Sequence, residues 1–216
     1  MMQFDIYQRE ALSKLKSGSI LVGGTGSGKS RTALAYFFVK ECGGTIEISD
    51  IPETEFSPMT KPKDLYIITT AAKRDKMEWE QEMIPFCLFK DKDKCVNHIS
   101  IVIDSWNNIA KYVEVKDAFF IFDEQRVVGS GAWVRAFQKI ANNNDWILLS
   151  ATPGDTWLDY IPVFIANGFY ENKTDFIRQH VIYSRYTKFP KVDRYLNTGK
   201  LIKHKNEDHS HQSRLL

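Results

Sequence analysis

A glycine-rich segment near the N-terminus, residues 23–30, reads Gly-Gly-Thr-Gly-Ser-Gly-Lys-Ser and fits the spacing G-x-x-x-x-G-K-S. Glycines allow the backbone N–H groups to wrap around an anion, and a helix that follows adds the positive end of its dipole. Lys29 would then reach the β- and γ-phosphates, and the Ser30 hydroxyl would hold Mg²⁺. The pattern therefore predicts a nucleoside triphosphate site formed by Gly24, Thr25, Gly26, Ser27, Gly28, Lys29 and Ser30. The alternative is a glycine-rich turn that carries Lys and Ser by chance.

An acidic pair, Asp123-Glu124, directly follows the apolar run Phe-Phe-Ile-Phe at residues 119–122. A carboxylate at the end of a buried strand can hold Mg²⁺, and its neighbour can orient or deprotonate a water molecule. We assign Asp123 to the metal and Glu124 to the water, so the predicted catalytic residues are Lys29, Asp123 and Glu124. An ordinary acidic loop after a strand is the alternative.

A third polar segment, Ser150-Ala151-Thr152-Pro153, follows the apolar run at residues 146–149. On its own it reads as a turn in which Pro153 ends the strand and the hydroxyl groups satisfy free backbone groups. The order in which it follows the glycine-rich loop and the acidic pair resembles that of a family named below, and this resemblance implies that Ser150 and Thr152 are coupling residues.

Each of these segments is expected at the end of a buried strand. Uninterrupted apolar runs are typical of strands in a parallel sheet that is covered on both faces, and five of them occur at residues 19–22, 65–69, 99–103, 119–122 and 146–149. Helical spacing is found between and around them, at residues 7–16, 29–40, 73–84, 131–142, 159–168 and 176–183. The excursion at residues 45–64 contains three prolines and a candidate short hairpin at residues 45–48.

This alternation predicts an α/β fold: a mostly parallel sheet with helices on both faces and with ligand groups at the carboxyl ends of the strands. The chain has 216 residues, of which 43% are hydrophobic, enough for one compact domain with a tail. Three cysteines without metal-ligand spacing argue against a disulfide framework or a zinc site. No run approaches the roughly 18 apolar residues of a membrane span, so we expect a cytoplasmic protein with no membrane partner.

The net charge of +2 does not itself indicate a nucleic-acid partner, but the charge is unevenly distributed. Residues 184–205 contain seven basic residues and a single acidic residue, Asp193. Aromatic residues lie among them, so this stretch could cradle a single strand. A solvated linker is the competing interpretation.

The order of the three motifs resembles that of superfamily 2 helicases and translocases of the Swi/Snf type, in which the glycine-rich and acidic segments are the Walker A and B motifs and Ser-Ala-Thr-Pro is motif III. Residues 67–73 with Trp79 and Glu82 resemble motif Ia and the Trp-x-x-Glu helix, and residues 104–107 resemble motif Ib. The overall organisation is most similar to that of bacteriophage-encoded members. The resemblance implies a RecA-like P-loop NTPase fold, ATP and Mg²⁺ as cofactors and a nucleic-acid partner, with DNA favoured.

Further residue roles come from this resemblance alone. Tyr7-Gln8 resembles the glutamine motif, so Gln8 would contact the adenine edge. Thr70, Lys73 and Ser105 would contact the nucleic-acid backbone, where most hydrogen bonds need only a well-placed donor. The competing interpretation is that Thr70 and Ser105 cap helices and that Lys73 is solvated.

The sequence departs from the family in two places. The acidic motif continues as Gln125-Arg126, where relatives have a small residue and then His or Asp, so coupling of ATP to nucleic acid through these two residues is in question. Nothing after Pro153 resembles a second RecA-like unit with its arginine fingers. We therefore expect a RecA-like domain at residues 1–183 and a basic linker or tail at residues 184–216, leading toward a second RecA-like domain in cis or in trans.

The expected function is the ATP-binding domain of a nucleic-acid-dependent ATPase, a DNA helicase or translocase, incomplete by itself. Two alternatives stay open at this point. A small-molecule phosphotransferase would share the phosphate loop but leaves Ser-Ala-Thr-Pro unexplained, and a non-catalytic module would bind ATP and nucleic acid or a partner without turnover.

Overall fold

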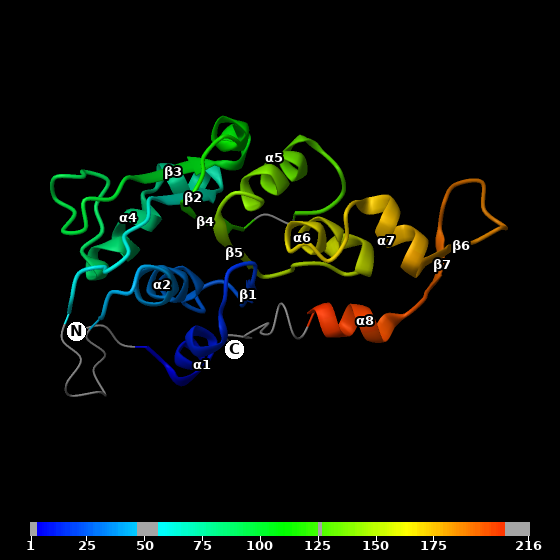
Figure 1. The fold of residues 1–216 in the computed structure, drawn as a ribbon, viewed down its shortest axis with the longest axis horizontal. Helices are drawn as coiled ribbons and strands as arrows, with labels where there is room; N and C mark the ends of the chain where they lie inside the picture. The colour runs from blue at the N-terminus through cyan, green and yellow to red at the C-terminus, as the bar shows by residue number, and fades with distance from the viewer. Residues whose placement is uncertain (1–3, 47–55, 125–126, 206–216) are drawn as a thin grey trace.

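Five parallel strands form the centre of the protein in a computed structural model that describes residues 4–46, 56–124 and 127–205 (Figure 1). The strand order across the sheet is β1-β5-β4-β2-β3. The strands are β1 (Ile20–Val22), β2 (Leu65–Thr69), β3 (Ile101–Ser105), β4 (Phe119–Asp123) and β5 (Asp145–Ser150). The expected α/β class with a parallel sheet is confirmed.

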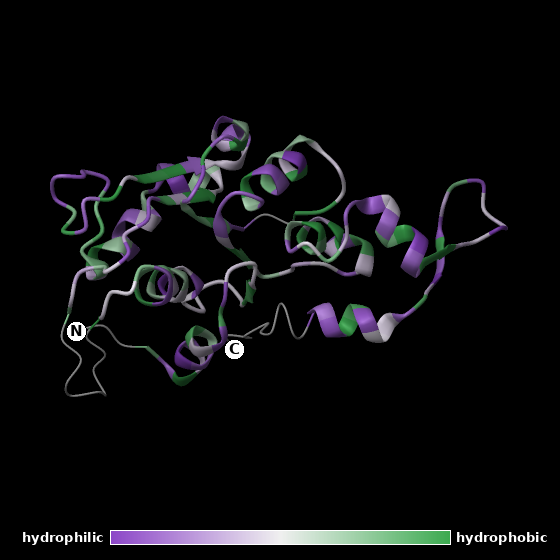
Figure 2. Cartoon of the chain, viewed as in Figure 1, coloured by the Kyte–Doolittle hydropathy of each residue, from purple (hydrophilic) through white to green (hydrophobic). Residues whose placement is uncertain are grey.

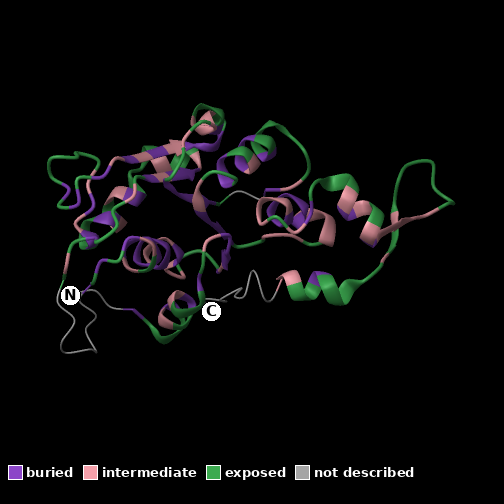
Figure 3. Ribbon diagram, viewed as in Figure 1, coloured by how far each residue is buried: buried purple, intermediate pink, exposed green. Residues whose placement is uncertain are grey.

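The strands of the sheet consist mainly of hydrophobic residues, and these residues are mainly buried (Figures 2 and 3). Every residue of β4 is buried, as a strand at the centre of a sheet covered on both faces requires. Alternate side chains divide between two cores: Phe119 and Ile121 pack on one face, whereas Phe120 and Phe122 pack on the other.

Helices cover both faces of the sheet, as expected. The first core includes residues of α1 (Ile6–Lys14), α2 (Lys29–Ala35) and α4 (Glu78–Met83). The second includes residues of α5 (Ala132–Ala141) and α6 (Ile161–Ala166). A π-helical turn over Tyr36–Glu41 extends α2, so the predicted helix at residues 29–40 continues in a wider winding.

The helix predicted at residues 73–84 is wrong as a single element. Two helices occupy this region, α3 (Ala71–Asp75) and α4, because Met77 takes a left-handed backbone conformation with φ of 55°. Such a residue cannot continue a right-handed helix. After this break, Trp79 and Met83 are buried in the first core.

Two other boundaries differ from the prediction. Strand β3 begins and ends two residues later than expected, because it pairs with β2 along its whole length, from Leu65 opposite Ile101 to Thr69 opposite Ser105. The helix predicted at residues 176–183 ends earlier: α7 covers Lys173–His180, and Val181–Tyr183 forms strand β6. Residues 47 and 48 of the candidate hairpin at residues 45–48 lie outside the described residues, although Thr45 forms an antiparallel bridge with Ser57.

A small hairpin follows α7 at the end of the molecule's long axis (Figure 1). Strand β6 pairs antiparallel with β7 (Val192–Tyr195), and α8 (Thr198–Lys203) follows. Leu201 of α8 is fully buried in the second core. The boundary predicted at residue 183 falls inside this hairpin and stays a prediction.

Candidate functional site

The sheet register brings the three polar segments to one edge. Val22 lies opposite Ser150, and Asp123 lies opposite Leu149, so β5 stands between the strands that carry the glycine-rich loop and the acidic pair. The backbone N–H of Gly23 donates to Ser150 O over 3.3 Å. All three segments therefore leave the sheet at the carboxyl ends of adjacent parallel strands, the usual place for ligand groups in such sheets.

The glycine-rich loop runs from β1 into α2. Gly26 and Gly28 have φ of 77° and 75°, a region that other residues rarely adopt. A Cβ atom at Gly28 would also lie 2.1 Å from Nε2 of Gln8, so the Gln8 side chain would have to move to admit any other residue there. Around Gly24 and Gly26 a Cβ would meet nothing within 4 Å, so the outer side of the loop is open.

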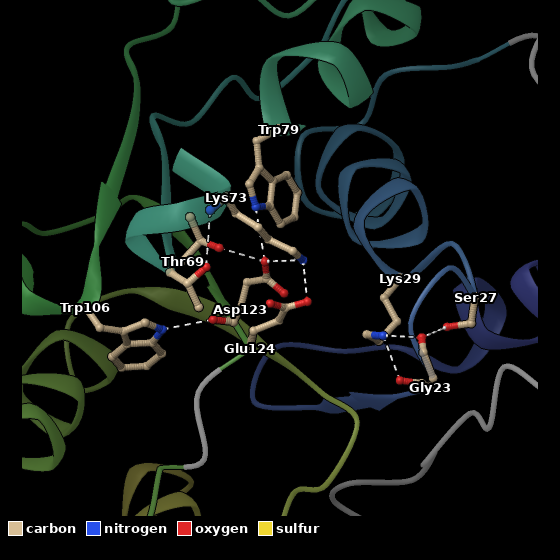
Figure 4. Close-up of polar contacts among 11 residues, drawn as sticks. Gly23, Ser27, Lys29, Thr69, Lys73, Trp79, Trp106, Asp123 and Glu124 are labelled. Atoms are coloured by element: carbon tan, nitrogen blue, oxygen red, sulfur yellow. Dashed lines mark hydrogen bonds and ion pairs between the residues drawn. The ribbon is translucent and has the colours of Figure 1, made fainter. Parts of the chain in front are cut away.

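Lys29, the first residue of α2, turns back across the loop (Figure 4). Its Nζ donates to Gly23 O at 2.7 Å and to Gly24 O at 2.6 Å. Burial lowers the pKa of Lys29, although the nearby carboxylates of Asp123 and Glu124 oppose this. The ammonium group is thus held beside the loop by neutral carbonyl groups that a phosphate could replace as its partner.

The other predicted loop residues surround this lysine. Gly24, Thr25 and Gly26 are exposed, and the Ser27 hydroxyl donates to Gly24 O at 2.8 Å. Ser30 is partly buried in the first turn of α2.

Gln8 lies against this loop. Its Nε2 donates to Gly28 O at 3.4 Å, and its Oε1 accepts the N–H of Asp5, which caps α1. With 7% of its surface exposed, Gln8 supports the loop in this structure. Its predicted contact with adenine stays a prediction.

Asp123 ends β4 and is completely buried. Its Oδ2 accepts three donors from the chain between β2 and α4: the Thr69 hydroxyl at 2.9 Å, the Trp79 indole at 3.2 Å and the Lys73 ammonium at 3.1 Å (Figure 4). Trp106 donates its indole N–H to the main-chain O of Asp123 at 2.9 Å. Burial raises the pKa of Asp123, whereas Lys73 and Thr69 act to lower it.

The second carboxylate oxygen of Asp123 is an observation in favour of a metal. Oδ1 is buried and has no hydrogen-bond partner, an arrangement that costs free energy unless a ligand or water satisfies it. Mg²⁺ is commonly held by one or two carboxylates together with substrate phosphates. Asp123 therefore fits the predicted metal site, and the roles of Asp123 and Ser30 as metal ligands stay predictions.

Glu124 has an unusual backbone conformation, with φ of 58°. Its N–H donates to Leu149 O at 3.1 Å, and its Oε1 lies 2.7 Å from Lys73 Nζ. Non-glycine residues in this region are uncommon and gather at functional sites. The turn leaves 37% of the Glu124 side chain exposed next to buried Asp123. Glu124 is therefore accessible to a water molecule.

The predicted coupling residues are only partly described. Ser150 is buried and its Oγ accepts the N–H of Thr152 at 3.1 Å, whereas Thr152 itself is exposed. Gln125 and Arg126 lie outside the described residues.

The predicted nucleic-acid residues lie around the ends of β2 and β3. Thr70 caps α3 by accepting the N–H of Lys73 at 3.3 Å. Ser105 is buried at the end of β3 and makes no side-chain cap hydrogen bond. The Lys73 side chain turns toward Asp123 and Glu124. Contacts of these three residues with nucleic acid stay predictions.

Sequence reasoning missed the donors that hold Asp123. Lys73 was recognised only as part of motif Ia and a candidate contact to nucleic acid, Trp79 only as part of the helix after that motif, and Trp106 only as part of motif Ib. Their shared target could not be read from the sequence, since 44 residues separate Trp79 from Asp123.

No protein-family model and no curated protein sequence matches the chain. Solved structures do. A Sulfolobus solfataricus SWI2/SNF2 ATPase core in complex with dsDNA is similar over 81% of this chain and 38% of that one, with 17% identity and a TM-score of 0.56. A Pyrococcus furiosus Hef helicase domain is similar over 84% of this chain and 41% of that one, with 20% identity and a TM-score of 0.52.

These similarities show the fold: the chain is an α/β domain with a RecA-like fold, as in the two solved structures. The chain spans about two fifths of the length of the two solved structures. Within the described ranges, no helix is both long enough and apolar enough to cross a bilayer.

Proposed function

We propose that this chain is the ATP-binding domain of a nucleic-acid-dependent ATPase, a DNA helicase or translocase that needs a second RecA-like domain. One observation carries the proposal: the glycine-rich loop, the acidic pair and the Ser-Ala-Thr-Pro segment meet at the carboxyl edge of a helicase-like sheet. If the glycine-rich segment were a turn that carries Lys and Ser by chance, there would be no reason for the other two segments to lie beside it.

The geometry supports a division of roles in this site. The backbone N–H groups of the glycine-rich loop and the Lys29 ammonium would bind the phosphates of ATP. Ser30 and Asp123 would hold Mg²⁺, which neutralises charge on the phosphates when it is bound. Glu124, partly exposed beside Asp123, would orient the attacking water.

The proposed partner and location draw on the similar proteins. The Sulfolobus solfataricus ATPase core is bound to dsDNA, which supports DNA as the partner here. We place the protein in the cytoplasm, that of the host if the chain is bacteriophage-encoded.

The test of ATP binding is Lys29→Met. Lys29 has 8% of its surface exposed, so methionine keeps the apolar stem in place while removing the charge. Loss of a charged contact to phosphate removes about 1.5–3 kcal/mol, which weakens nucleotide binding by roughly 10- to 100-fold. Titration of a fluorescent ATP analogue with Mg²⁺ measures the affinity, and thermal melts establish that the variant is folded.

Lys40→Met is the matched control, because Lys40 lies beyond α2 in the π-helical turn and outside the loop. Nucleotide affinity should be unchanged in this control. Equal affinity of the Lys29→Met protein and the wild type would refute the assignment of the loop. Tight binding by the wild type with no hydrolysis, alone or with a second domain, would instead identify a non-catalytic ATP-dependent module.

A further inference from the structure

Lys73 contacts both members of the acidic pair. Its Nζ lies 3.1 Å from Asp123 Oδ2 and 2.7 Å from Glu124 Oε1 (Figure 4). It reaches them from α3, which begins directly after β2, whereas the pair lies at the end of β4. The Lys73 ammonium group thus pairs with both carboxylates, although the backbone turn at Glu124 points the two side chains in different directions.

The contact between Lys73 and Asp123 is shielded from water. Only 20% of the Lys73 side chain and 1% of the Asp123 side chain are exposed. The other donors to Asp123 Oδ2, Thr69 and Trp79, are neutral. Within the described residues, Lys73 is the cation that forms ion pairs with Asp123 and Glu124. The Lys29 ammonium donates instead to the carbonyl groups of its own loop.

One ammonium beside two carboxylates lowers the negative charge that a metal ion would experience. Coulomb attraction between buried or half-buried charges at these distances amounts to several kcal/mol, so removing one positive charge changes cation binding strongly. Asp123 Oδ1 is buried and has no hydrogen-bond partner, so it is a candidate ligand atom for the ion. Mg²⁺ needs further oxygen ligands, and phosphates commonly supply them.

We propose that Lys73 is the internal counter-ion of Asp123 and Glu124: it holds the two carboxylates together and keeps a free divalent cation from binding until nucleotide phosphates complete the ligand set. Lys73 is thereby a positioning residue for the water-orienting Glu124. The inference rests on the proposed nucleotide site and concerns how that site takes up its metal.

The test measures Mn²⁺ binding to the nucleotide-free chain by electron paramagnetic resonance, which distinguishes free from bound ion. Lys73→Gln should bind Mn²⁺ at least about tenfold more tightly than the wild type, since it removes one positive charge beside two carboxylates. Lys73→Arg keeps the charge and should bind as weakly as the wild type. Lys76→Gln is the matched control, because Lys76 follows α3 and has the same charge without contact to the pair.

A second variant excludes an indirect effect of altered folding. Asp123→Asn combined with Lys73→Gln restores the charge balance and should remove the gain in Mn²⁺ affinity. Unchanged Mn²⁺ affinity in a folded Lys73→Gln protein would overturn the inference. So would a gain that persists in the double variant, because the extra ion would then bind elsewhere.

The proposed function and this inference can fail separately. Absence of nucleotide binding by the wild type contradicts the proposed function, whereas normal nucleotide binding with unchanged Mn²⁺ affinity in Lys73→Gln contradicts only the inference. Fluorescence anisotropy with a labelled DNA strand decides the competing role of Lys73. A loss of DNA affinity in Lys73→Gln, with Mn²⁺ affinity unchanged, would assign Lys73 to the nucleic acid and refute the counter-ion role.

Discussion

The indole N–H of Trp79 lies 3.2 Å from Oδ2 of Asp123, so α4 contacts the last residue of β4 directly. The same helix is tied to α2 by an ion pair of 3.1 Å between Glu82 and Arg31. Helix α4 therefore connects α2, the helix that follows the glycine-rich loop, to the carboxylate proposed to hold the metal. A Trp and a Glu three residues apart lie on one face of the helix, which allows both contacts.

Trp79→Phe should reduce both stability and Mg²⁺-dependent nucleotide affinity. Trp79 is buried, so phenylalanine preserves most of the packing but removes the donor to Asp123. Loss of a hydrogen bond to a charged group together with some buried volume should lower the free energy of unfolding by about 2 kcal/mol. Urea unfolding and nucleotide titrations with and without Mg²⁺ measure the two effects.

Trp146→Phe provides the comparison, because Trp146 is equally buried but belongs to the second core. We expect it to lower stability without changing the effect of Mg²⁺ on nucleotide affinity. If both variants altered the Mg²⁺ effect equally, the Trp79 contact would have no specific role in orienting Asp123.

Glu124→Gln should separate binding from turnover. Glutamine keeps the shape of the side chain but removes the charge that aligns water, so Mg²⁺-ATP binding should persist while any hydrolysis is suppressed. Single-turnover hydrolysis with the protein in excess over labelled ATP is the appropriate assay for a domain of low activity. Loss of nucleotide binding in a folded Glu124→Gln protein would instead make Glu124 a metal ligand.

Asp104 should make the stability of the protein depend on acidic pH. Burial alone would raise its pKa, but hydrogen bonds from Asn108, Tyr112, the Ser105 N–H and Arg74 outweigh this and lower the pKa from 3.8 to about 2. Because the folded pKa lies below the unfolded one, the stabilisation is present above about pH 4 and is lost as the pH falls toward 2. It amounts to about 2 kcal/mol.

Asp104→Asn tests this relationship. The variant should be less stable than the wild type at pH 7 and similar to it near pH 2, as measured by urea unfolding across that range. Asp93→Asn, at an exposed position, should leave the pH dependence unchanged. A constant stability difference between the Asp104→Asn protein and the wild type at all pH values would show that the carboxylate charge contributes nothing.

The sheet was predictable because its signal is local. Apolar runs such as the one at residues 119–122 can be buried on both faces only in a covered sheet, and the glycine-rich loop fixes the start of α2. All five expected strands are present, four within a residue of their predicted ends and β3 shifted by two.

The rest depends on tertiary contacts that no local pattern contains. Nothing in the sequence around Met77 predicts its left-handed conformation, so the break between α3 and α4 could not be predicted. Val181–Tyr183 became a strand because Val192–Tyr195 pairs with it. The donors to Asp123 converge only after β2 and β4 have paired, so the sequence showed the acidic pair without the groups that hold it.

The isolated chain should show weak or no DNA-stimulated ATP hydrolysis and should not unwind a duplex. Within the described residues, the cations beside Asp123 and Glu124 are the two lysines, Lys29 and Lys73. In related phosphate-loop enzymes, an arginine that stabilises the transferred phosphoryl group contributes about 10³ to 10⁵ in rate. In this fold family we expect a second RecA-like domain to supply it.

DNA binding by the chain can survive without turnover, and it should weaken as salt concentration rises if phosphate contacts dominate. Steady-state ATP hydrolysis with and without single-stranded DNA, together with a strand-displacement assay, measures both activities on a verified monomer. Adding the second domain in trans should raise hydrolysis if the site is completed between domains. Fast, DNA-stimulated turnover by the monomer alone would mean that residues of this chain, including those after β6, already complete the site, and the half-site interpretation would then be wrong.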